Sequence, residues 1–512
     1  MLFNSSIFIL AFLPVTLALF FAVGRVSPNA AATLLGLASL VFYGAWSVQY
    51  VPLLLASIGV NFALSQVLGD TARRPGTRRA VFILAICANL ALLGYFKYAN
   101  FFLNSWADAT GSNLALWSIV LPLGISFYTF TQIAFLADTW KNQVRERNFA
   151  HYLLFVTYFP HLIAGPILHH AEMMPQFRNK AIYRPNWENI AIGVSVFIMG
   201  LAKKTLIADG IAPVGRAVFT SADYGQQIEF FRAWGGALAY AMQIYFDFSG
   251  YCDMAIGISI LFGVRLPLNF NSPYKATSIV DFWRRWHMTL SRFLRDYLYV
   301  PLGGSRRSRP RRYVNLMITM LLGGLWHGAA WTYVAWGGLH GFYLVVNHAW
   351  EYLRKKIAPN ARPAGRFVRA LSVLLTFAAV TVAWVLFRAN SFASAMRIIS
   401  GMAGLNGIDL PAKAASLKTL AANIGMAPVS QTPYISNTAI LGLLLLLTMC
   451  WLAPNAYQIM GAKNPALNAV EPGARWTWRP SLGWAVGLGV LGAVAFTGIL
   501  TGPPSEFLYF QF

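Results

Sequence analysis

Two histidines, His287 and His327, stand in sequence patterns that predict a role in catalysis. His287 ends the run Asp281-Phe-Trp-Arg-Arg-Trp-His, and His327 lies within Gly323-Gly-Leu-Trp-His-Gly. An imidazole titrates near neutral pH, so it can remove a proton from a hydroxyl group. The glycines beside His327 remove side-chain bulk, which lets a substrate approach closely. The pair therefore predicts a general base and an assisting group for acyl transfer, with a purely structural buried histidine as the alternative for each.

A second group of polar side chains interrupts an apolar run further towards the N-terminus. Gln243, Asp247, Ser249 and Asp253 lie among aromatic and aliphatic neighbours. Ionisable groups inside a membrane segment are costly, so they are either functional or paired with a partner. Two interpretations follow: contacts to a substrate, or structural hydrogen bonds to tyrosine and backbone groups.

The stretch Arg284 to Arg312 carries much of the positive charge of the chain. It holds nine arginines and one acid, Asp296, and so contributes +8 to the net charge of +23. Loops rich in Lys and Arg are retained in the cytoplasm, and this rule alone explains such a cluster. Guanidinium groups also bind phosphate bidentately, so a docking surface for a phosphate-bearing acyl donor is the functional alternative.

The remaining histidines are weaker candidates. His340 and His348 follow His327 in the same apolar run and are interpreted as packing or interface residues. The pair His169-His170 has no carboxylate at metal-ligand spacing except Glu172, so no metal site is predicted there.

Several mechanisms lack sequence support. The chain contains no GxSxG, P-loop, HExxH or His-x4-Asp pattern, so neither a serine mechanism nor a metallohydrolase is indicated. The three cysteines are too far apart for a zinc ribbon or a disulfide framework: Cys87, Cys252 and Cys450.

The composition predicts which elements must position these residues. Of 512 residues, 57% are hydrophobic and 11% are charged, whereas about 25% are charged in a typical soluble domain. An ordinary soluble enzyme is excluded, and the chain is too apolar to be a nucleic-acid-binding arm. An all-α, polytopic membrane protein is predicted.

Apolar stretches of about 20 residues between charges mark the expected membrane segments. Val26 to Gly69 holds two spans separated at Ser47 to Tyr50, and Tyr313 to Trp350 is long enough for a hairpin of two. Other candidates are Met1 to Gly24, Ala80 to Phe96, Asn113 to Ala137, Asn189 to Ala202, Ala233 to Gly263, Ala370 to Phe387, Thr438 to Leu452 and Ser481 to Gly502.

Basic loops orient these segments with the N-terminus outside. His151 to Ala171 would join two basic loops by one crossing and contains Pro160 and Pro166, so a broken, re-entrant segment is predicted there. About 11 to 13 membrane segments result. We expect one membrane domain over residues 1–512, with core motifs at 94–350, an outer loop at about 390–437 and C-terminal helices at 438–512.

At these motifs the chain resembles the membrane-bound O-acyltransferase (MBOAT) family, in particular its bacterial branch that acetylates alginate. The resemblance covers most of the chain. Its most specific stretches are Gly94 to Phe101, Leu121 to Phe127, Phe159 to Pro166, Tyr245 to Tyr251, Trp283 to His287, Gly324 to Gly328 and the closing Tyr509 to Phe512.

The resemblance implies re-entrant helices around a central funnel and transfer of an acyl group, usually acetyl. The essential histidine of the family corresponds to His327 and its second polar position to His287. Positions implied or expected to bind the substrate or donor are Trp283, Arg284, Arg285, Trp326, Asp247 and Gln243.

The donor expected is acetyl-CoA or another thioester, with no bound cofactor and no metal. The resemblance implies a multi-pass protein of the bacterial cytoplasmic (inner) membrane, surrounded by lipid, that works with periplasmic acetyltransferases and not with nucleic acid. The expected product is an O-acetylated exopolysaccharide such as alginate. The alternatives are acetylation of cellulose or another polymer, acylation of a lipid, D-alanyl transfer to teichoic acid, and a polytopic transporter.

Overall fold

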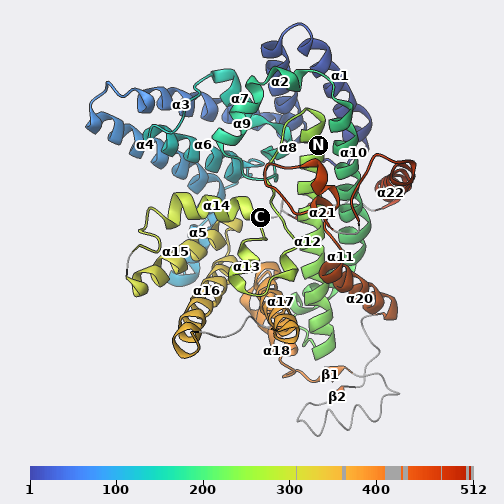
Figure 1. Ribbon diagram of the computed structural model, residues 1–512. Helices are drawn as coiled ribbons and strands as arrows, with labels where there is room; N and C mark the ends of the chain where they lie inside the picture. Colours follow the sequence, from blue (N-terminus) through green and yellow to red (C-terminus); the bar gives the residue numbers. More distant parts are fainter. Residues whose placement is uncertain are drawn as a thin grey trace. The chain divides into compact units, whose positions relative to one another are not determined.

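The computed structural model describes residues 1–306, 308–359, 365–409, 428–429, 436–473, 476–502 and 507–508. Nearly all regular structure in these residues is helical (Figure 1), and the only strands among them are the two-residue β1 (Ile408–Asp409) and β2 (Pro428–Val429), which pair in parallel. The prediction of an all-α fold is confirmed. The closing residues 509–512 lie outside the described residues.

The chain forms two compact units, each assembled from separate stretches of sequence. The first comprises residues 1–202, 250–269 and 456–511, and the second comprises 203–249, 270–455 and 512. Helix α12 (Phe230–Leu261) supplies residues to both.

The first unit packs its helices mainly as sequence neighbours and near neighbours. In Figure 1, α3 and α4 run beside each other and both contact α6. Leu68, Ala85 and Leu136 form a buried core cluster between these three helices. The helices of this unit are α1 (Leu13–Gly24), α2 (Pro28–Ser47), α3 (Val51–Gly69), α4 (Pro75–Leu93), α5 (Ala99–Thr110), α6 (Ile125–Trp140), α7 (Phe149–Thr157), α8 (Phe159–Leu162), α9 (His170–Arg178), α10 (Trp187–Ala202), α21 (Ala456–Met460) and α22 (Leu482–Thr501).

The second unit contains the helices that carry His287 and His327. In this unit the sequence-adjacent helices α15 and α16 pack closely together, and α16 also packs on α17. Besides part of α12, its helices are α11 (Asp209–Asp223), α13 (Ile279–Trp283), α14 (Met288–Leu294), α15 (Arg309–His327), α16 (Trp331–Ile357), α17 (Arg366–Arg388), α18 (Phe392–Met402) and α20 (Asn437–Leu452).

Six helical stretches among the described residues are long and apolar enough to cross a membrane, or seven if the interrupted pair α20 and α21 counts as one span. A multi-pass membrane protein is thus supported, but the count is below the predicted 11 to 13. One reason is that helices predicted as separate spans run on continuously, as in Pro28–Gly69, where a single 3-10 turn at Val48–Tyr50 joins α2 to α3.

Other predicted spans are too short or broken. Residues 113–124 are not helical, so α6 covers only the second part of the span predicted at Asn113 to Ala137. The predicted break within His151 to Ala171 is confirmed: α7 ends before Tyr158, Pro160 lies in the four-residue helix α8, and Pro166 lies in the irregular stretch before α9. Proline cannot donate a helical hydrogen bond, which explains both interruptions.

Two loop assignments from the sequence are corrected. The segment Asn189 to Ala202 does not end before Lys203 and Lys204, because the helix continues through a π-helical turn (Lys203–Ala208) into α11. The start of the expected outer loop is helical, as α18. Most of the remainder of that loop lies outside the described residues.

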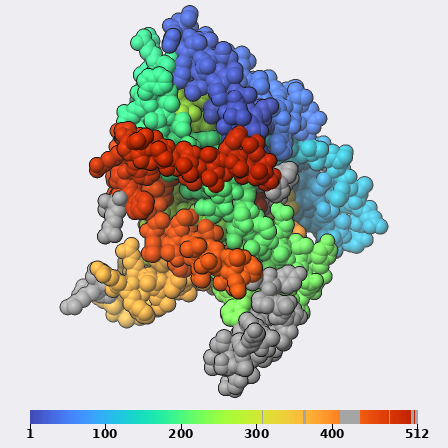
Figure 2. All heavy atoms as spheres, turned by 90° about the vertical axis from the view of Figure 1, so that its right-hand side faces the viewer, coloured from blue at the N-terminus to red at the C-terminus, as the bar shows by residue number. Residues whose placement is uncertain are grey.

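Apolar side chains on α22 face outwards, as expected for a helix in contact with lipid. Leu482, Val486 and Val490 are 81%, 56% and 60% exposed, and their spacing of four residues places them on one helix face. Figure 2 shows α22 in dark red at the surface, and α10 packs against it. Exposed apolar area of this extent is unfavourable in water and indicates a membrane-facing surface.

The helical hairpin α15–α16 depends on glycines that let the two backbones touch. The chain turns at Gly328–Ala330, so a helical hairpin forms within Tyr313 to Trp350 as predicted, but neither of its helices is among the six stretches that are long and apolar enough to cross a membrane. A Cβ added to Gly324 would overlap the carbonyl oxygen of Tyr333, and one added to Gly337 would overlap that of Met320. Both positions therefore require glycine at this separation of the helices.

Substituting Gly324→Ala should separate the two helices and destabilise the second unit by about 1–3 kcal/mol or more, because a backbone oxygen cannot move aside as a side chain can. The matched control is Gly338→Ala in α16, whose added Cβ would lie 3.3 Å from the mobile Leu321 Cδ2. Thermal unfolding in detergent measures both. Equal transition midpoints for the two variants would contradict this account of the hairpin.

Candidate functional site

His327 is the last residue of α15 and is held among aromatic rings of the second unit. Its side chain is buried, with 4% of the residue exposed. Its ring lies edge-to-face with Trp326, Trp336 and Phe387, at centroid distances of 4.9, 5.1 and 5.3 Å. Three large rings fix the imidazole and keep its surroundings apolar.

His287 reaches the same region from a different part of the chain. It precedes α14, is fully buried, and its ring packs at 89° on Phe248 of α12 at 4.9 Å. The centroids of His287 and His327 are 6.2 Å apart. At that separation one substrate group can contact both imidazoles, so the structure brings together the two residues that the sequence singled out.

The backbone of His287 adopts the left-handed conformation, with φ 42° and ψ 53°. This region costs an ordinary L-residue about 1–2 kcal/mol. Strain of this kind persists where the surrounding structure enforces it and is frequent at functional sites. Here it turns the chain between Trp286 and Met288 and leaves the imidazole buried.

Burial lowers the pKa of the His287 imidazole to about 3. Because the ordinary value is near 6.5, the ring is neutral throughout the physiological range. A neutral imidazole carries one N–H donor and one lone pair. It can therefore donate a hydrogen bond to a carbonyl oxygen without bringing a net charge into an apolar site.

The aromatic surroundings contain residues that the sequence reasoning missed. Trp336 contacts His327 and also packs on Trp283 and His340, at 5.9 and 4.9 Å. Phe387, from α17, closes another side of His327. The one sequence signal for Trp336 is the adjacent Gly337, which marks the α16 face that touches α15.

The predicted donor-binding residues are found in different environments. Trp326 contacts both histidines, and Trp283 joins the cluster through Trp336. Arg284 is exposed, whereas the Nε of Arg285 donates to Asp281 Oδ1 at 2.8 Å. Arg284 is thus the more accessible of the two guanidinium groups.

Asp247 belongs to a buried ion-pair network. Lys204 Nζ lies 2.7 Å from Asp247 Oδ1 and 2.8 Å from Asp209 Oδ1, and the side chains of Lys204 and Asp247 are 3% and 2% exposed. Gln243, one helical turn before Asp247 on α12, is half-buried. The structure therefore supports the paired interpretation of Asp247, and the π-helical turn is what aims Lys204 at it.

Comparison of the sequence with known proteins identifies the family of this chain. The profile of the membrane-bound O-acyltransferase family matches residues 80–393, a range that contains His287, His327 and most of their aromatic neighbours. The chain belongs to the MBOAT family.

Named relatives of this MBOAT protein are acyl-transferring enzymes. The peptidoglycan O-acetyltransferase of Helicobacter pylori is 44% identical over 438 residues, covering 80% of this chain and 81% of the relative. The probable alginate O-acetylase AlgI of Pseudomonas aeruginosa is 41% identical, covering 78% and 75%. The teichoic acid D-alanyltransferase of Bacillus subtilis is 27% identical, covering 54% and 70%. The protein is a multi-pass membrane O-acetyltransferase, as the family and these relatives support.

The left-handed backbone at His287 makes a prediction for this MBOAT protein. His287→Gly and His287→Ala both remove the imidazole, but only glycine relieves the strained φ, so the glycine variant should be more stable by about 1 kcal/mol. Unfolding midpoints of the purified variants in detergent provide the comparison. An alanine variant as stable as the glycine variant would show that the backbone there is not strained.

The buried lysine makes a second prediction. Lys204→Met leaves the carboxylate of Asp247 buried beside an apolar side chain, which should cost about 3–5 kcal/mol. The double variant Lys204→Met/Asp247→Asn should recover part of that loss, since the uncompensated charge is gone.

A matched control comes from the partly exposed pair Lys463–Glu188, whose side chains are 32% and 58% exposed. Lys463→Met should change the stability far less than Lys204→Met does, because water and salt screen an exposed ion pair. Chemical unfolding of all three variants tests the network, and a double variant no more stable than Lys204→Met would argue against it.

Proposed function

We propose that this MBOAT protein transfers an acetyl group from a cytosolic thioester, acetyl-CoA, for O-acetylation of an exopolysaccharide such as alginate. The observation that carries the proposal is the pair of buried imidazoles, His287 and His327, 6.2 Å apart among aromatic rings. The proposed location is the bacterial cytoplasmic membrane, in which an acetyl group from the cytosol can be passed to an acceptor outside.

In the proposed reaction, His327 acts as the general base. It removes the proton of the acceptor hydroxyl while the oxygen attacks the thioester carbonyl, so that a C–O bond forms and the C–S bond breaks. The proton then passes from His327 to the departing thiolate. His287, neutral and fully buried, donates a hydrogen bond to the carbonyl oxygen as negative charge develops there.

The donor is proposed to approach along the arginine-rich stretch. Arg284 is exposed, and its guanidinium group suits the phosphates of a CoA thioester. Trp283, the last residue of α13, joins the aromatic cluster through its contact with Trp336. Positive charge at the surface and aromatic rings inside would together guide a donor with a charged head and an uncharged acyl end.

The acceptor is proposed to be a polysaccharide hydroxyl, reached with the help of periplasmic acetyltransferases. Alginate is supported by the 41% identity to the alginate O-acetylase. Peptidoglycan is a second candidate, because the peptidoglycan O-acetyltransferase shares 44% identity over a similar length. The lower identity of 27% to the teichoic acid D-alanyltransferase favours acetyl over D-alanyl as the transferred group.

His327→Ala should abolish acetyl transfer while the protein still inserts and accumulates, because loss of a general base costs about 10²- to 10⁴-fold in rate. The measurement is release of label from radioactive acetyl-CoA by purified protein. His348→Ala, a half-buried histidine of α16, serves as the control and should retain the activity. Undiminished label release by His327→Ala would overturn the assignment.

The acceptor is identified by the acetate content of polymers from a deletion strain. Loss of acetate from the exopolysaccharide alone supports the primary proposal, and loss from peptidoglycan alone supports the second candidate. Unchanged acetate in both would contradict the polysaccharide proposal, even if purified protein consumes acetyl-CoA.

A further inference from the structure

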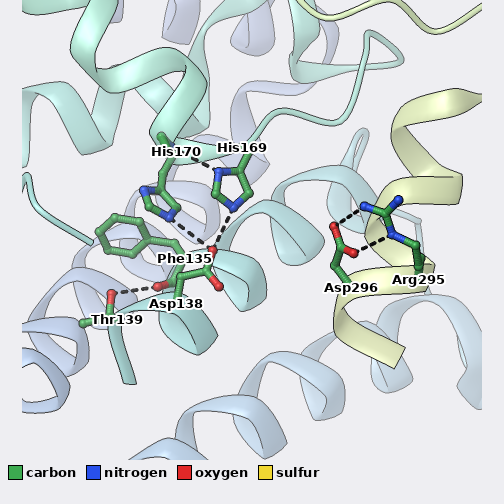
Figure 3. Close-up of polar contacts among 8 residues, drawn as sticks. Phe135, Asp138, Thr139, His169, His170, Arg295 and Asp296 are labelled. Atoms are coloured by element: carbon green, nitrogen blue, oxygen red, sulfur yellow. Dashed lines mark hydrogen bonds and ion pairs between the residues drawn. The ribbon is translucent and has the colours of Figure 1, made fainter. Parts of the chain in front are cut away.

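A second cluster of histidines lies in the first unit, at a place where no complete set of metal ligands was recognisable from the sequence. Asp138, three residues before the start of the basic loop at Lys141, meets His169 and His170 (Figure 3). The Nε2 atoms of His169 and His170 lie 2.9 and 3.1 Å from the same oxygen, Asp138 Oδ2. The sequence analysis predicted no metal here because it found no suitable carboxylate nearby, and the fold supplies one from α6.

Local backbone geometry explains why two adjacent side chains converge. Consecutive residues inside a helix diverge by about 100° around its axis. His169 instead caps α9 with an extended backbone, φ −107° and ψ 136°, while His170 is the first helical residue. The change of conformation between them brings their ring centroids to 4.4 Å, so that both face Asp138.

The ligand atoms have the spacing of a coordination shell. All three lie within 4.8 Å of one another. With metal–ligand bonds of about 2.0–2.1 Å, the ligand atoms of a tetrahedral site stand about 3.3 Å apart, slightly more than the two nitrogen–oxygen distances of 2.9 and 3.1 Å here. The set also combines burial with access, since the side chains of Asp138 and His170 are 4% and 6% exposed and that of His169 is 33% exposed.

The chemistry of the set selects the kind of ion. Two imidazole nitrogens and one carboxylate suit divalent transition metals such as zinc, cobalt or iron. Magnesium and calcium prefer shells made of oxygen alone. Three protein ligands leave at least one coordination position for water or another ligand.

The same distances also suit hydrogen bonds from two neutral imidazoles to one carboxylate. In that arrangement the Nδ1 of His169 accepts from the Ala171 N–H at 3.3 Å, which leaves its Nε2 as the donor. A metal on Nε2 moves the remaining ring proton to Nδ1 and ends this contact. The contact is long for a hydrogen bond, so the loss is small.

We propose that Asp138, His169 and His170 form a binding site for a divalent transition metal of the zinc class. The ion connects the end of α6 to the start of α9. In the sequence, the interrupted segment that contains α7 and α8 lies between these two helices. Bound there, it fixes the end of that segment. The site does not depend on the proposed acetyl transfer, because none of its three residues belongs to the cluster around His287 and His327.

The test uses the full-length protein in detergent, stripped with a chelator and then titrated with Zn²⁺ or Co²⁺. The expected result is about one metal ion per chain by elemental analysis, and a Co²⁺ visible absorption spectrum typical of nitrogen and oxygen ligands. His169→Ala should weaken binding by more than about tenfold. Because His169 is the most exposed ligand, this variant is the least damaging to the fold.

The isosteric Asp138→Asn variant supplies a second test in which the shape of the site is retained. The control is His151→Ala, which removes a histidine that pairs with Glu146 in the same unit but lacks a third ligand. It should leave metal binding unchanged. Substoichiometric metal in the parent protein would overturn the proposal. So would a metal affinity of His169→Ala and Asp138→Asn equal to that of the parent protein, and either result would favour a purely hydrogen-bonded cluster.

Discussion

The close approach of α15 to α16 is the constraint on which the candidate site depends. Gly324 and Gly337 let each backbone touch carbonyl oxygens of the other helix. His327 is the last residue of α15, and this contact brings Trp336 of α16 against its ring. A side chain at either glycine would separate His327 from the aromatic surface that holds it, so the position of this imidazole depends on close packing of two helix backbones.

The charged side chains of Lys204, Arg284 and Arg295 lie either buried beside groups of opposite charge or exposed at the surface. The buried Lys204 has two carboxylates within 2.8 Å, whereas Arg284 stays exposed. Arg295, further along the arginine-rich stretch, pairs with Asp296 through Nε and a second guanidinium nitrogen, at 2.7 and 3.0 Å (Figure 3). Isolated charge is costly in an apolar interior, and the two candidate catalytic groups avoid the cost by being histidines that can be buried neutral.

Hydropathy was sufficient to predict the helical class, the α15–α16 hairpin and the break at Pro160, because each follows from local composition or from the missing N–H of proline. His287 and His327 were also predicted, from unusual residues in an apolar or aromatic context and from the family resemblance. The pairing of Asp138 with His169 and His170 was not, since it joins positions more than 30 residues apart through a backbone change at one helix start. The π-helical turn at Lys203–Ala208 was missed for a similar reason: hydropathy places lysines at helix ends, and burial of Lys204 becomes favourable through Asp209 and the distant Asp247.

The aromatic surroundings of His327 also bear on the order of proton movements in the proposed acyl transfer. In that proposal the imidazolium ion of His327 forms beside Trp326, Trp336 and Phe387, three rings that offer no basic atom to take up its proton. It returns its proton readily to the nearest developing anion, which in a thioester reaction is the departing thiolate. In the proposed reaction one imidazole therefore serves first as a base towards the acceptor hydroxyl and then as an acid towards the departing thiolate.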